Sequence, residues 1–411
     1  MIRIAILGHG VVGSGVAEVL SCNKDTVAHK AGEEIAVGRI LDLRSFPDLP
    51  YADLFTTSFD DIVNDPTIRI VVETMGGLHP AYEFVKASLL AGKSVVTSNK
   101  ELVAAYGDEL LAIARDNNLN FMFEASVGGG IPILRPLDQC LAANEVCEIA
   151  GILNGTTNFM LTRMVQDGAD FDSALAEAQQ LGYAERNPAA DVEGHDACRK
   201  ICILASLAFG KHVYPDQVCT EGITKLTPAD VRCAEALGCV IKLIGRVRRE
   251  NGKLHILVAP MLISKSSLLA DVNDVFNGIL VRGNAIGDVV FYGRGAGKLP
   301  TASAVVADVI DEVRHMESRK PLFWEAGEEG YVLDAAIDSY ARLLRFRTTD
   351  RRALLNRLNE VFGEITEVTY VGAADDEVAV RTAPLSETAL NDALAALADA
   401  PLLSRLRVAA L

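Results

Sequence analysis

The chain has 411 residues, of which 50% are hydrophobic and 23% charged, a composition typical of globular proteins and not of disordered chains. Lysine and arginine total 39 against 55 aspartate and glutamate residues, so the formal net charge is −16. This balance disfavours a protein that coats nucleic acid. No apolar run approaches the roughly 18 residues of a membrane span, so we expect no membrane partner either.

The first residues enter a strand pattern directly, which indicates no signal peptide. The eight cysteines include no Cys-x-x-Cys pair. We interpret them as reduced thiols of a cytoplasmic protein. Cys198 and Cys202 are four residues apart on a predicted helix, a spacing that without further ligands indicates packing rather than metal binding.

Residues 1–130 alternate short apolar runs with helical patterns. We predict strands at Ile2–Leu7, Ile35–Leu41, Ile68–Glu73, Ser94–Thr97 and Asn120–Glu124, and helices at Val11–Leu20, Pro80–Ala91 and Lys100–Asp116. Apolar strands separated by helices are typical of a parallel sheet covered on both faces. The predicted fold class is α/β, with a Rossmann-type doubly wound sheet in this domain.

The glycines at 128–130 interrupt this pattern, and we place a domain boundary there. Residues 131–320 are predicted to form an α+β domain. We predict strands at Cys147–Leu153, Ile241–Arg248, His255–Pro260 and Val289–Tyr292, and helices at Phe159–Asp167, Phe171–Leu181, Asp191–Phe209 and Thr301–Arg314.

Residues 335–411 read as a separate unit with the order βαββαβ, a ferredoxin-like arrangement. The predicted strands are Ser339–Arg347, Ile365–Val371, Glu377–Thr382 and Ser404–Ala409, and the predicted helices Asp350–Glu360 and Glu387–Ala398.

A glycine-rich turn follows the first strand and opens the first helix. It reads Gly8-His9-Gly10-Val11-Val12-Gly13. In a dinucleotide-binding loop of this spacing, Gly8 permits the tight turn, Gly10 lets the backbone approach a pyrophosphate, and Gly13 permits close helix packing. The helix N-terminus then offers free N–H groups to the phosphates. The competing interpretation is a purely structural turn.

Two charged residues after the second strand bear on the choice of cofactor. Asp42, 29 residues after Gly13, favours the free 2′-hydroxyl of NAD, whereas Arg44 could pair with the 2′-phosphate of NADP. The sequence leans slightly to NAD. A solvated surface charge is the alternative for each residue.

An acid–lysine group lies in the stretch from Gly182 to Lys200. We predict that Asp191 caps the following helix and that Asp196 and Lys200, at i and i+4, share one helical face. Ile203 and Leu207 continue that face, which indicates that it turns inward. Such a pair suits proton transfer, whereas the alternative is a weak surface ion pair.

Together with these motifs, several further stretches show that the chain resembles the homoserine dehydrogenase family over essentially its whole length. The matching stretches are Gly8–Gly13, Ser98–Leu102, Glu124–Pro132, Leu153–Asn158, Gly182–Lys200 and Gly293–Thr301. The most specific is Gly182–Lys200, where Asn187 replaces the aspartate usual in the family.

The resemblance implies reversible reduction of L-aspartate 4-semialdehyde to L-homoserine with NAD(P)H, in threonine, methionine and isoleucine biosynthesis. It implies that Lys200 donates and accepts the proton, that Asp196 orients Lys200, and that Lys100 is a second lysine beside cofactor and substrate. It places Glu185 and Asp191 on the substrate's amino group.

For the cofactor, NAD or NADP, the resemblance implies contacts from Ser98, Lys100 and Gly297 besides the glycine turn. It also implies a sodium or potassium site. The matching positions are Glu124 and the backbone carbonyls of Val127, Gly129 and Ile131, hard oxygen ligands for a hard cation.

The C-terminal order resembles the ACT-like domain of longer homoserine dehydrogenases, which implies threonine as a possible effector. The turn after its first strand, residues 348–353, lacks the glycine that such domains usually place at the ligand. An oligomerising domain in a homodimer or homotetramer is the competing interpretation.

Two other functions compete with the one implied. One is a dehydrogenase for another small aldehyde or imine, which would not need Glu185 and Asp191. The other is an amino-acid sensor with an inactive nucleotide domain, against which Lys100, Asp196 and Lys200 all argue.

Overall fold

The computed structural model describes residues 1–318 and 322–411, so the predicted domain end at residue 320 lies outside the described residues. Two compact units are present. Unit 1 comprises Met1–Glu145, Cys202–Pro215 and Gly293–Glu328, and unit 2 comprises Val146–Ile201, Asp216–Tyr292 and Glu329–Leu411. No helix in the described ranges is long and apolar enough to cross a membrane.

Unit 1 is built on a six-stranded parallel sheet in the order β3-β2-β1-β4-β5-β6. The strands are β1 (Ile2–Leu7), β2 (Ile35–Leu41), β3 (Phe55–Thr56), β4 (Ile68–Glu73), β5 (Ser94–Thr97) and β6 (Phe121–Met122). The parallel pairing confirms the predicted N-terminal α/β fold. The strand order reverses direction between β1 and β4, the place where sheets of this kind bind ligands beyond their carboxyl ends.

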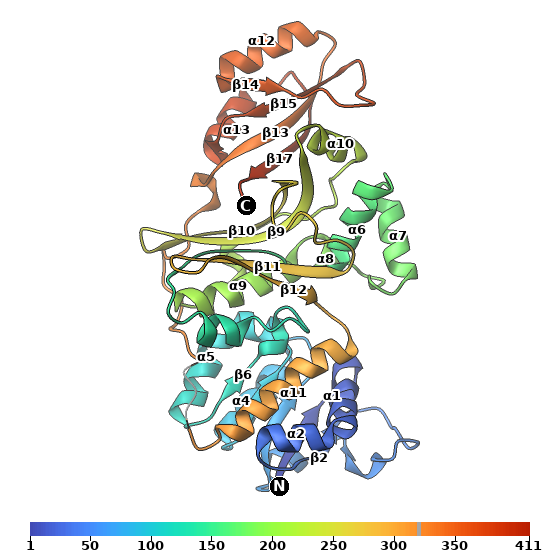
Figure 1. Cartoon of the computed structure of the whole chain (residues 1–411), viewed down its shortest axis with the longest axis vertical. Helices are drawn as coiled ribbons and strands as arrows, with labels where there is room; N and C mark the ends of the chain where they lie inside the picture. The colour runs from blue at the N-terminus through green and yellow to red at the C-terminus, as the bar shows by residue number, and fades with distance from the viewer. Residues whose placement is uncertain (319–321) are drawn as a thin grey trace. The chain divides into compact units, whose positions relative to one another are not determined.

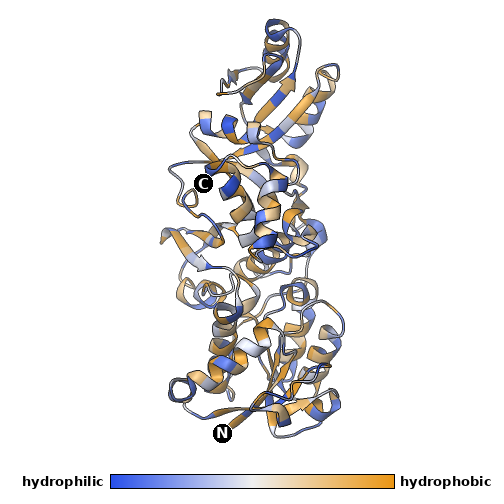
Figure 2. Cartoon of the chain, turned by 90° about the vertical axis from the view of Figure 1, so that its right-hand side faces the viewer, coloured by the Kyte–Doolittle hydropathy of each residue, from blue (hydrophilic) through white to orange (hydrophobic). Residues whose placement is uncertain are grey.

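The helices of unit 1 surround this sheet (Figure 1). They are α1 (Val11–Cys22), α2 (Lys24–Ala31), α3 (Asp60–Val63), α4 (Ala81–Leu90), α5 (Lys100–Asp116) and α11 (Lys298–Arg314). Helix α11 comes from far along the sequence and packs against α1 and α2. Its Ala302, Val305 and Val309 are fully buried at helical spacing and join the core around β1 and β4. Figure 2 shows the apolar residues of these buried strands in orange.

Unit 2 is built on a mixed eleven-stranded sheet. Its main order is β12-β11-β7-β9-β10-β17-β13-β15-β14, with β8 paired to β10 and β16 to β13. The strands are β7 (Val146–Ile152), β8 (Cys219–Thr220), β9 (Cys239–Glu250), β10 (Lys253–Ser264), β11 (Phe276–Gly283), β12 (Gly287–Arg294), β13 (Ser339–Arg347), β14 (Ile365–Glu367), β15 (Glu377–Thr382), β16 (Leu385–Ser386) and β17 (Leu402–Ala409). Strand β17 pairs in parallel with β10, so the C-terminal strands continue the central sheet.

The helices of unit 2 are α6 (Gly155–Gln166), α7 (Phe171–Gln180), α8 (Ala189–Val192), α10 (Pro228–Ala236), α12 (Arg351–Phe362) and α13 (Glu387–Ala395). Helix α9 (His195–Phe209) begins in this unit. Along the chain the C-terminal elements follow the order β13, α12, β14, β15, α13, β17, with the short β16 before α13. Their apolar side chains form a core of their own around Leu344, Phe346 and Leu390.

Three predicted helix starts are wrong; one of them, Thr301, lies inside α11, which begins at Lys298. Helix α6 begins at Gly155 rather than Phe159, because the Asn154 side chain accepts from the Thr157 amide at 2.8 Å and caps the helix earlier. Asp191 does not cap a long helix: it lies within α8, and Gly194, with φ +85°, separates α8 from α9. The prediction also omits the strands β3, β8, β11 and β16 and the helices α2, α3 and α10.

Candidate active site

The glycine turn of unit 1 has the geometry that its spacing predicts. Gly8 has φ +91°, a conformation that favours glycine, and a Cβ on Gly13 would lie 1.9 Å from the Gly8 carbonyl oxygen. A Cβ on Gly10 would meet no atom within 4 Å, so the backbone is open there to a ligand. Gly10 is the N-cap of α1 and no side chain of the described residues caps this helix, which leaves the amides of Val11 and Val12 in the first turn for a phosphate.

Asp42 and Arg44, which compete in the sequence, form an ion pair in the structure. The Asp42 carboxylate accepts from Arg44 Nε at 3.0 Å, Arg44 Nη2 at 2.9 Å, and the amides of Arg44 and His9. The hydrogen bonds from Arg44 hold the pKa of Asp42 well below its usual range. A pocket beside this pair is also lined by Phe46, Phe55 and other residues. Asp42 is therefore already occupied by protein donors, and Arg44 covers it.

The carboxyl ends of β4 and β5 meet in a buried polar network that the sequence analysis missed. Glu73 Oε2 accepts from Thr97 Oγ1 at 2.5 Å, and Glu73 Oε1 accepts from the Met75 amide at 2.7 Å. Burial raises the pKa of Glu73, which is fully enclosed. Asn99 accepts from the Leu102 amide at 3.1 Å and caps α5. A glutamate at the end of a strand next to the reversal of strand order is the signal that could have found it.

This network leads directly to two predicted cofactor residues. Ser98 is half-buried, and its amide donates to the Glu73 carbonyl at 3.3 Å. Lys100 is half-buried and is the first residue of α5, directly after the Asn99 cap. The network therefore fixes the backbone on which Ser98 and Lys100 stand.

The predicted metal positions lie in a loop whose glutamate, Glu124, binds backbone amides of the protein. Glu124 is 3% exposed, and its carboxylate accepts from the amides of Ile133, Leu134 and Arg135 at 2.6–2.8 Å. Arg135 Nε also lies 3.6 Å from it. Within the described ranges, no group of three or more histidine, cysteine, aspartate or glutamate side chains is placed to hold a metal ion.

The two glycine-rich loops of unit 1 pack backbone against backbone. The amide of Gly130 donates to the Arg294 carbonyl at 3.1 Å, and a Cβ on Gly129 would lie 2.4 Å from the Gly295 carbonyl oxygen. Gly297 has φ +125° and is the N-cap of α11. Val127 and Ile131 are buried beside this contact. The sequence analysis singles out both loops but does not pair them.

In unit 2 the acid–lysine group is a buried cluster. Lys200 Nζ donates to Asp196 Oδ2 and to the Leu153 carbonyl, both at 2.7 Å. The side chains of Lys200 and Asp196 are 10% and 7% exposed. This confirms the predicted inward face and excludes a surface ion pair. Cys198 and Cys202 are also buried in α9.

Asn154 links Asp191, the other acid of the predicted group, to this cluster. Its Nδ2 donates to Asp191 Oδ1 at 2.7 Å and to Asp196 Oδ2 at 2.8 Å. Its Oδ1 meanwhile caps α6. The loss of Asp191 as a helix cap is thus explained, because its carboxylate faces Asn154. The sequence analysis gives the 154–158 stretch no firm role, yet Asn154 is the hub of the cluster.

Glu185 is the predicted substrate residue for which no contact to this cluster is described. Its side chain is exposed, and its carbonyl accepts from Gln179 Nε2 at 3.1 Å. Its loop is nevertheless anchored near α6, since Thr156 Oγ1 donates to the Tyr183 carbonyl at 2.6 Å. An exposed carboxylate on such a loop is available to a cationic ligand.

The arrangement suits proton transfer at an oxygen. An ammonium held at two points by a carboxylate and a carbonyl has a fixed position and can still offer a proton to a third acceptor, since lysine has three N–H donors. Partial burial strengthens its attraction for a negative charge that develops nearby.

Comparisons with known proteins identify the family of the chain. The family model "Homoserine dehydrogenase, NAD binding domain" matches residues 8–124, and the model "Homoserine dehydrogenase" matches residues 132–310. A Pseudomonas aeruginosa homoserine dehydrogenase is 40% identical over 412 residues, covering 96% of this chain and 95% of the relative. The chain belongs to the homoserine dehydrogenase family.

Other members of the homoserine dehydrogenase family support the assignment. The Synechocystis enzyme is 48% identical over 76% of this chain and 73% of its own length. The crystal structure of the Thiobacillus denitrificans homoserine dehydrogenase superposes with a TM-score of 0.91 at 38% identity, covering 100% of this chain and 98% of that one. As a member of this family, the chain is an NAD(P)-dependent oxidoreductase.

Proposed function

We propose that the chain catalyses the reversible NAD(P)H-dependent reduction of L-aspartate 4-semialdehyde to L-homoserine. The observation that carries this proposal is the buried Lys200–Asp196 pair, bound to Asn154 and the Leu153 carbonyl, in a chain of the homoserine dehydrogenase family. The reaction also needs a site for the nicotinamide cofactor, and the glycine turn at Gly8–Gly13 supports one. A hyperthermophilic archaeal homoserine dehydrogenase in complex with NADPH, 30% identical over 75% of this chain with a TM-score of 0.64, supports a nicotinamide cofactor.

Each residue of the cluster has a chemical task in this proposal. The nicotinamide, when bound, supplies the hydride. Lys200 stabilises the negative charge that develops on the carbonyl oxygen and delivers its proton there. Asp196 and the Leu153 carbonyl orient Lys200 through two of its N–H groups. In the reverse direction Lys200 accepts the proton of the hydroxyl.

We assign Glu185 and Asp191 to the substrate's ammonium group. Both are carboxylates near the start of α6, one on the surface loop and one beside Asn154. An ammonium group is best held by more than one carboxylate, since each adds a charge-assisted hydrogen bond. This assignment favours an amino-acid aldehyde over a simple aldehyde.

We assign the cofactor to the amides at the start of α1 and to Ser98, Lys100 and Gly297. The open space at Gly10 fits a pyrophosphate, which requires close approach of the backbone. The ion pair of Asp42 and Arg44 contains one group that could recognise NAD, the carboxylate, and one that could recognise NADP, the guanidinium. The guanidinium suits a 2′-phosphate, and the carboxylate would suit a ribose hydroxyl once the Arg44 side chain moves off it.

We limit the alkali-ion proposal to backbone oxygens. The Glu124 carboxylate does not fit a metal ligand, because three backbone amides already bind it. Carbonyl oxygens of Glu124, Val127, Gly129 and Ile131 remain suitable hard ligands for sodium or potassium. Comparing activity in sodium, potassium and choline chloride at equal ionic strength tests this.

We also propose three functional segments: residues 1–130 for the cofactor, 131–320 for substrate binding and dimerisation, and 335–411 as an ACT-like segment. The sheet order β17-β13-β15-β14 and the two helices support the last. Because the turn at residues 348–353 has no glycine, close backbone approach by an effector is harder, and an oligomerising role is favoured over threonine binding.

The test is an activity assay on the purified chain. Aspartate semialdehyde should cause loss of reduced-nicotinamide absorbance, and homoserine with oxidised cofactor should cause its gain. A control with a simple aldehyde that lacks the amino group should react far more slowly. Equal rates with both aldehydes would contradict the assigned substrate.

A further inference from the structure

Helix α5, which begins with Lys100, bends at Tyr106. Tyr106 has φ −134° and ψ 16°, outside the helical range, although the helix continues to Asp116. Just before the bend, the imidazole Nε2 of His212 lies 3.0 Å from the Ala104 carbonyl oxygen. A side chain that bonds to a helical carbonyl from outside is a known cause of such a bend.

The protonation of His212 is set by Trp324. Trp324 Nε1 can only donate, and it lies 2.9 Å from His212 Nδ1. Nδ1 is therefore the acceptor, and Nε2 carries the proton that is donated to Ala104. His212 is 1% exposed, and burial lowers its pKa, although Asp108 Oδ1, 3.8 Å from Nδ1, opposes that shift. Neutral His212 thus donates in one direction only.

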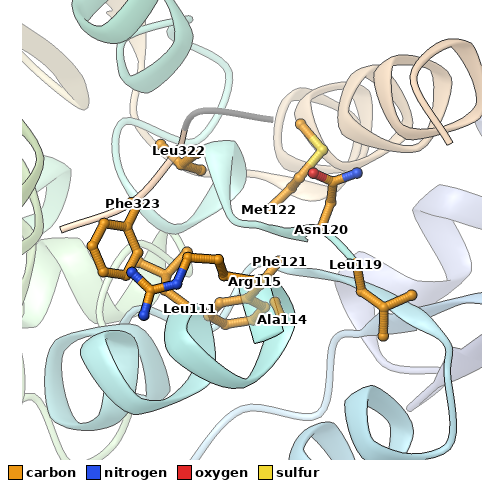
Figure 3. Close-up of a pocket in the computed structure, with 9 residues that line it drawn as sticks. All are labelled: Leu111, Ala114, Arg115, Leu119, Asn120, Phe121, Met122, Leu322 and Phe323. Atoms are coloured by element: carbon orange, nitrogen blue, oxygen red, sulfur yellow. The ribbon is translucent and has the colours of Figure 1, made fainter. Parts of the chain in front are cut away.

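The segment that carries Trp324 lies across α5 and is attached on both sides. Phe323 packs on the Arg115 guanidinium, whose central carbon lies 4.2 Å from the ring centroid. Figure 3 shows these two side chains next to each other. Glu325 exchanges backbone hydrogen bonds with Gly210 and His212 at 2.9 and 2.8 Å. The indole and the imidazole therefore have fixed positions.

The helix makes room for this contact at Gly107. A Cβ there would lie 2.6 Å from Trp324 Cζ2, closer than any real side chain allows. The first turns of α5 and the Trp324 ring are thus in direct contact at a position that only glycine permits. The bend at Tyr106, Gly107 and the rings of His212 and Trp324 are thus neighbours in one part of the molecule, all within unit 1.

We propose that His212 is a positioning residue for Lys100. It acts through the Ala104 carbonyl, one helical turn after Lys100, and fixes the direction of the first turn of α5. The Asn99 cap holds the same turn from its other end. This inference rests on the proposed role of Lys100 beside cofactor and substrate.

The test uses two amides that each reproduce half of the imidazole. His212→Gln places an N–H group near the position of Nε2, so it can still donate to Ala104. His212→Asn keeps an acceptor for Trp324 at the position of Nδ1 but is too short to reach Ala104. A role in packing alone predicts stability losses that follow side-chain volume, without faster exchange confined to residues 100–106.

We expect kcat to fall at least about tenfold in His212→Asn and to stay within about threefold of the wild type in His212→Gln, as loss of one hydrogen bond to a positioned group implies. Hydrogen exchange should quicken about five- to tenfold in residues 100–106 of His212→Asn, with residues 108–116 unchanged. This second readout needs no substrate, so it separates this inference from the proposed activity.

Equal kcat and equal exchange in the two variants would overturn the proposal. If His212→Asn does not fold, Trp324→Phe replaces it. That variant removes the indole donor, together with the part of the ring that packs on Gly107, and frees His212 to adopt the other tautomer, so faster exchange in residues 100–106 is expected. Unchanged exchange there would also overturn the proposal.

Discussion

The amide nitrogen of Asn154 donates to Asp196 Oδ2 at 2.8 Å, the same oxygen that accepts from Lys200 at 2.7 Å. That amide also binds Asp191, while the Asn154 oxygen caps α6. One side chain thus ties the start of a helix to both acids of the cluster. The position of Lys200 depends on this link through Asp196.

Asn154→Ser separates the two tasks of Asn154. Serine keeps the helix cap but is too short to reach both acids, so we expect kcat to fall about tenfold, because about one hydrogen bond that positions the reacting group is lost. Thermal stability should also fall, because the buried Asp196 carboxylate loses one of its donors. Asn154→Ala is the control, since it also loses the cap and should cost about 1 kcal/mol more stability. A serine variant with wild-type kcat would show that the link has no catalytic role.

Asp42→Asn should move cofactor preference toward NADPH. The substitution removes the negative charge next to a 2′-phosphate and releases Arg44 to bind it. We expect the ratio of kcat/KM for NADPH to that for NADH to rise about tenfold, the effect of about 1.4 kcal/mol. Asp48→Asn, an exposed acid of the same loop, should leave the ratio unchanged. A fall in the ratio for Asp42→Asn would contradict this.

Because of Lys242, the free energy of unfolding should rise with pH in the alkaline range. Its ammonium is 3% exposed and donates to the Val272 carbonyl at 2.5 Å and to Asn273 Oδ1 at 3.1 Å, and burial lowers its pKa to about 8. The unfolded chain holds this proton to about pH 10.4. Between these values the unfolded state binds more protons, so the group stabilises the fold increasingly as pH rises, by about 1.4 kcal/mol per unit.

The measurement compares the free energy of unfolding of wild type and Lys242→Met from pH 7 to 10. The free energy of unfolding of the wild type, relative to that of Lys242→Met, should be constant below pH 8 and rise with pH above it. Lys253→Met, at an exposed lysine, is the control and should show no such trend. A difference that is flat across the whole range would refute the assignment.

The sequence predicts best what depends on local pattern. The ranges of β1, β2, β4, β5, β13, β15 and α5 agree with the structure, because each is a strong apolar repeat with clear limits. It predicts poorly what depends on distant partners. The two-residue β3 gains its partner only from β2, and Glu73 gains its network only when β4 and β5 lie side by side. The sequence marks Glu73 as a strand-end glutamate, but not the residues that bind it.

The same division holds in the site. The i, i+4 spacing places Asp196 beside Lys200 correctly, since both stand on one helix. The role of Asn154 depends on a strand end meeting a helix 42 residues later, which spacing does not reveal. Asp42 and Arg44 appear as rivals in sequence, but they are partners because a turn brings the guanidinium back onto the carboxylate.

Gly129→Ala tests the contact between the two glycine-rich loops. The new Cβ would meet the Gly295 oxygen at 2.4 Å and require φ +54°, so we expect a loss of about 2–5 kcal/mol from strain and overpacking. Gly182→Ala is the matched control. It has φ +75° but open space, so it should lose only about 1–2 kcal/mol. Equal losses in chemical unfolding would show that the loops do not touch.

The most direct test of the account is the reduction rate of aspartate semialdehyde by Lys200→Met. If Lys200 delivers the proton, kcat should fall about 10²–10⁴-fold while the fluorescence titration of reduced cofactor gives an unchanged Kd. A folded Lys200→Met enzyme with kcat within a few-fold of the wild type would contradict the assignment of Lys200, and with it the mechanism.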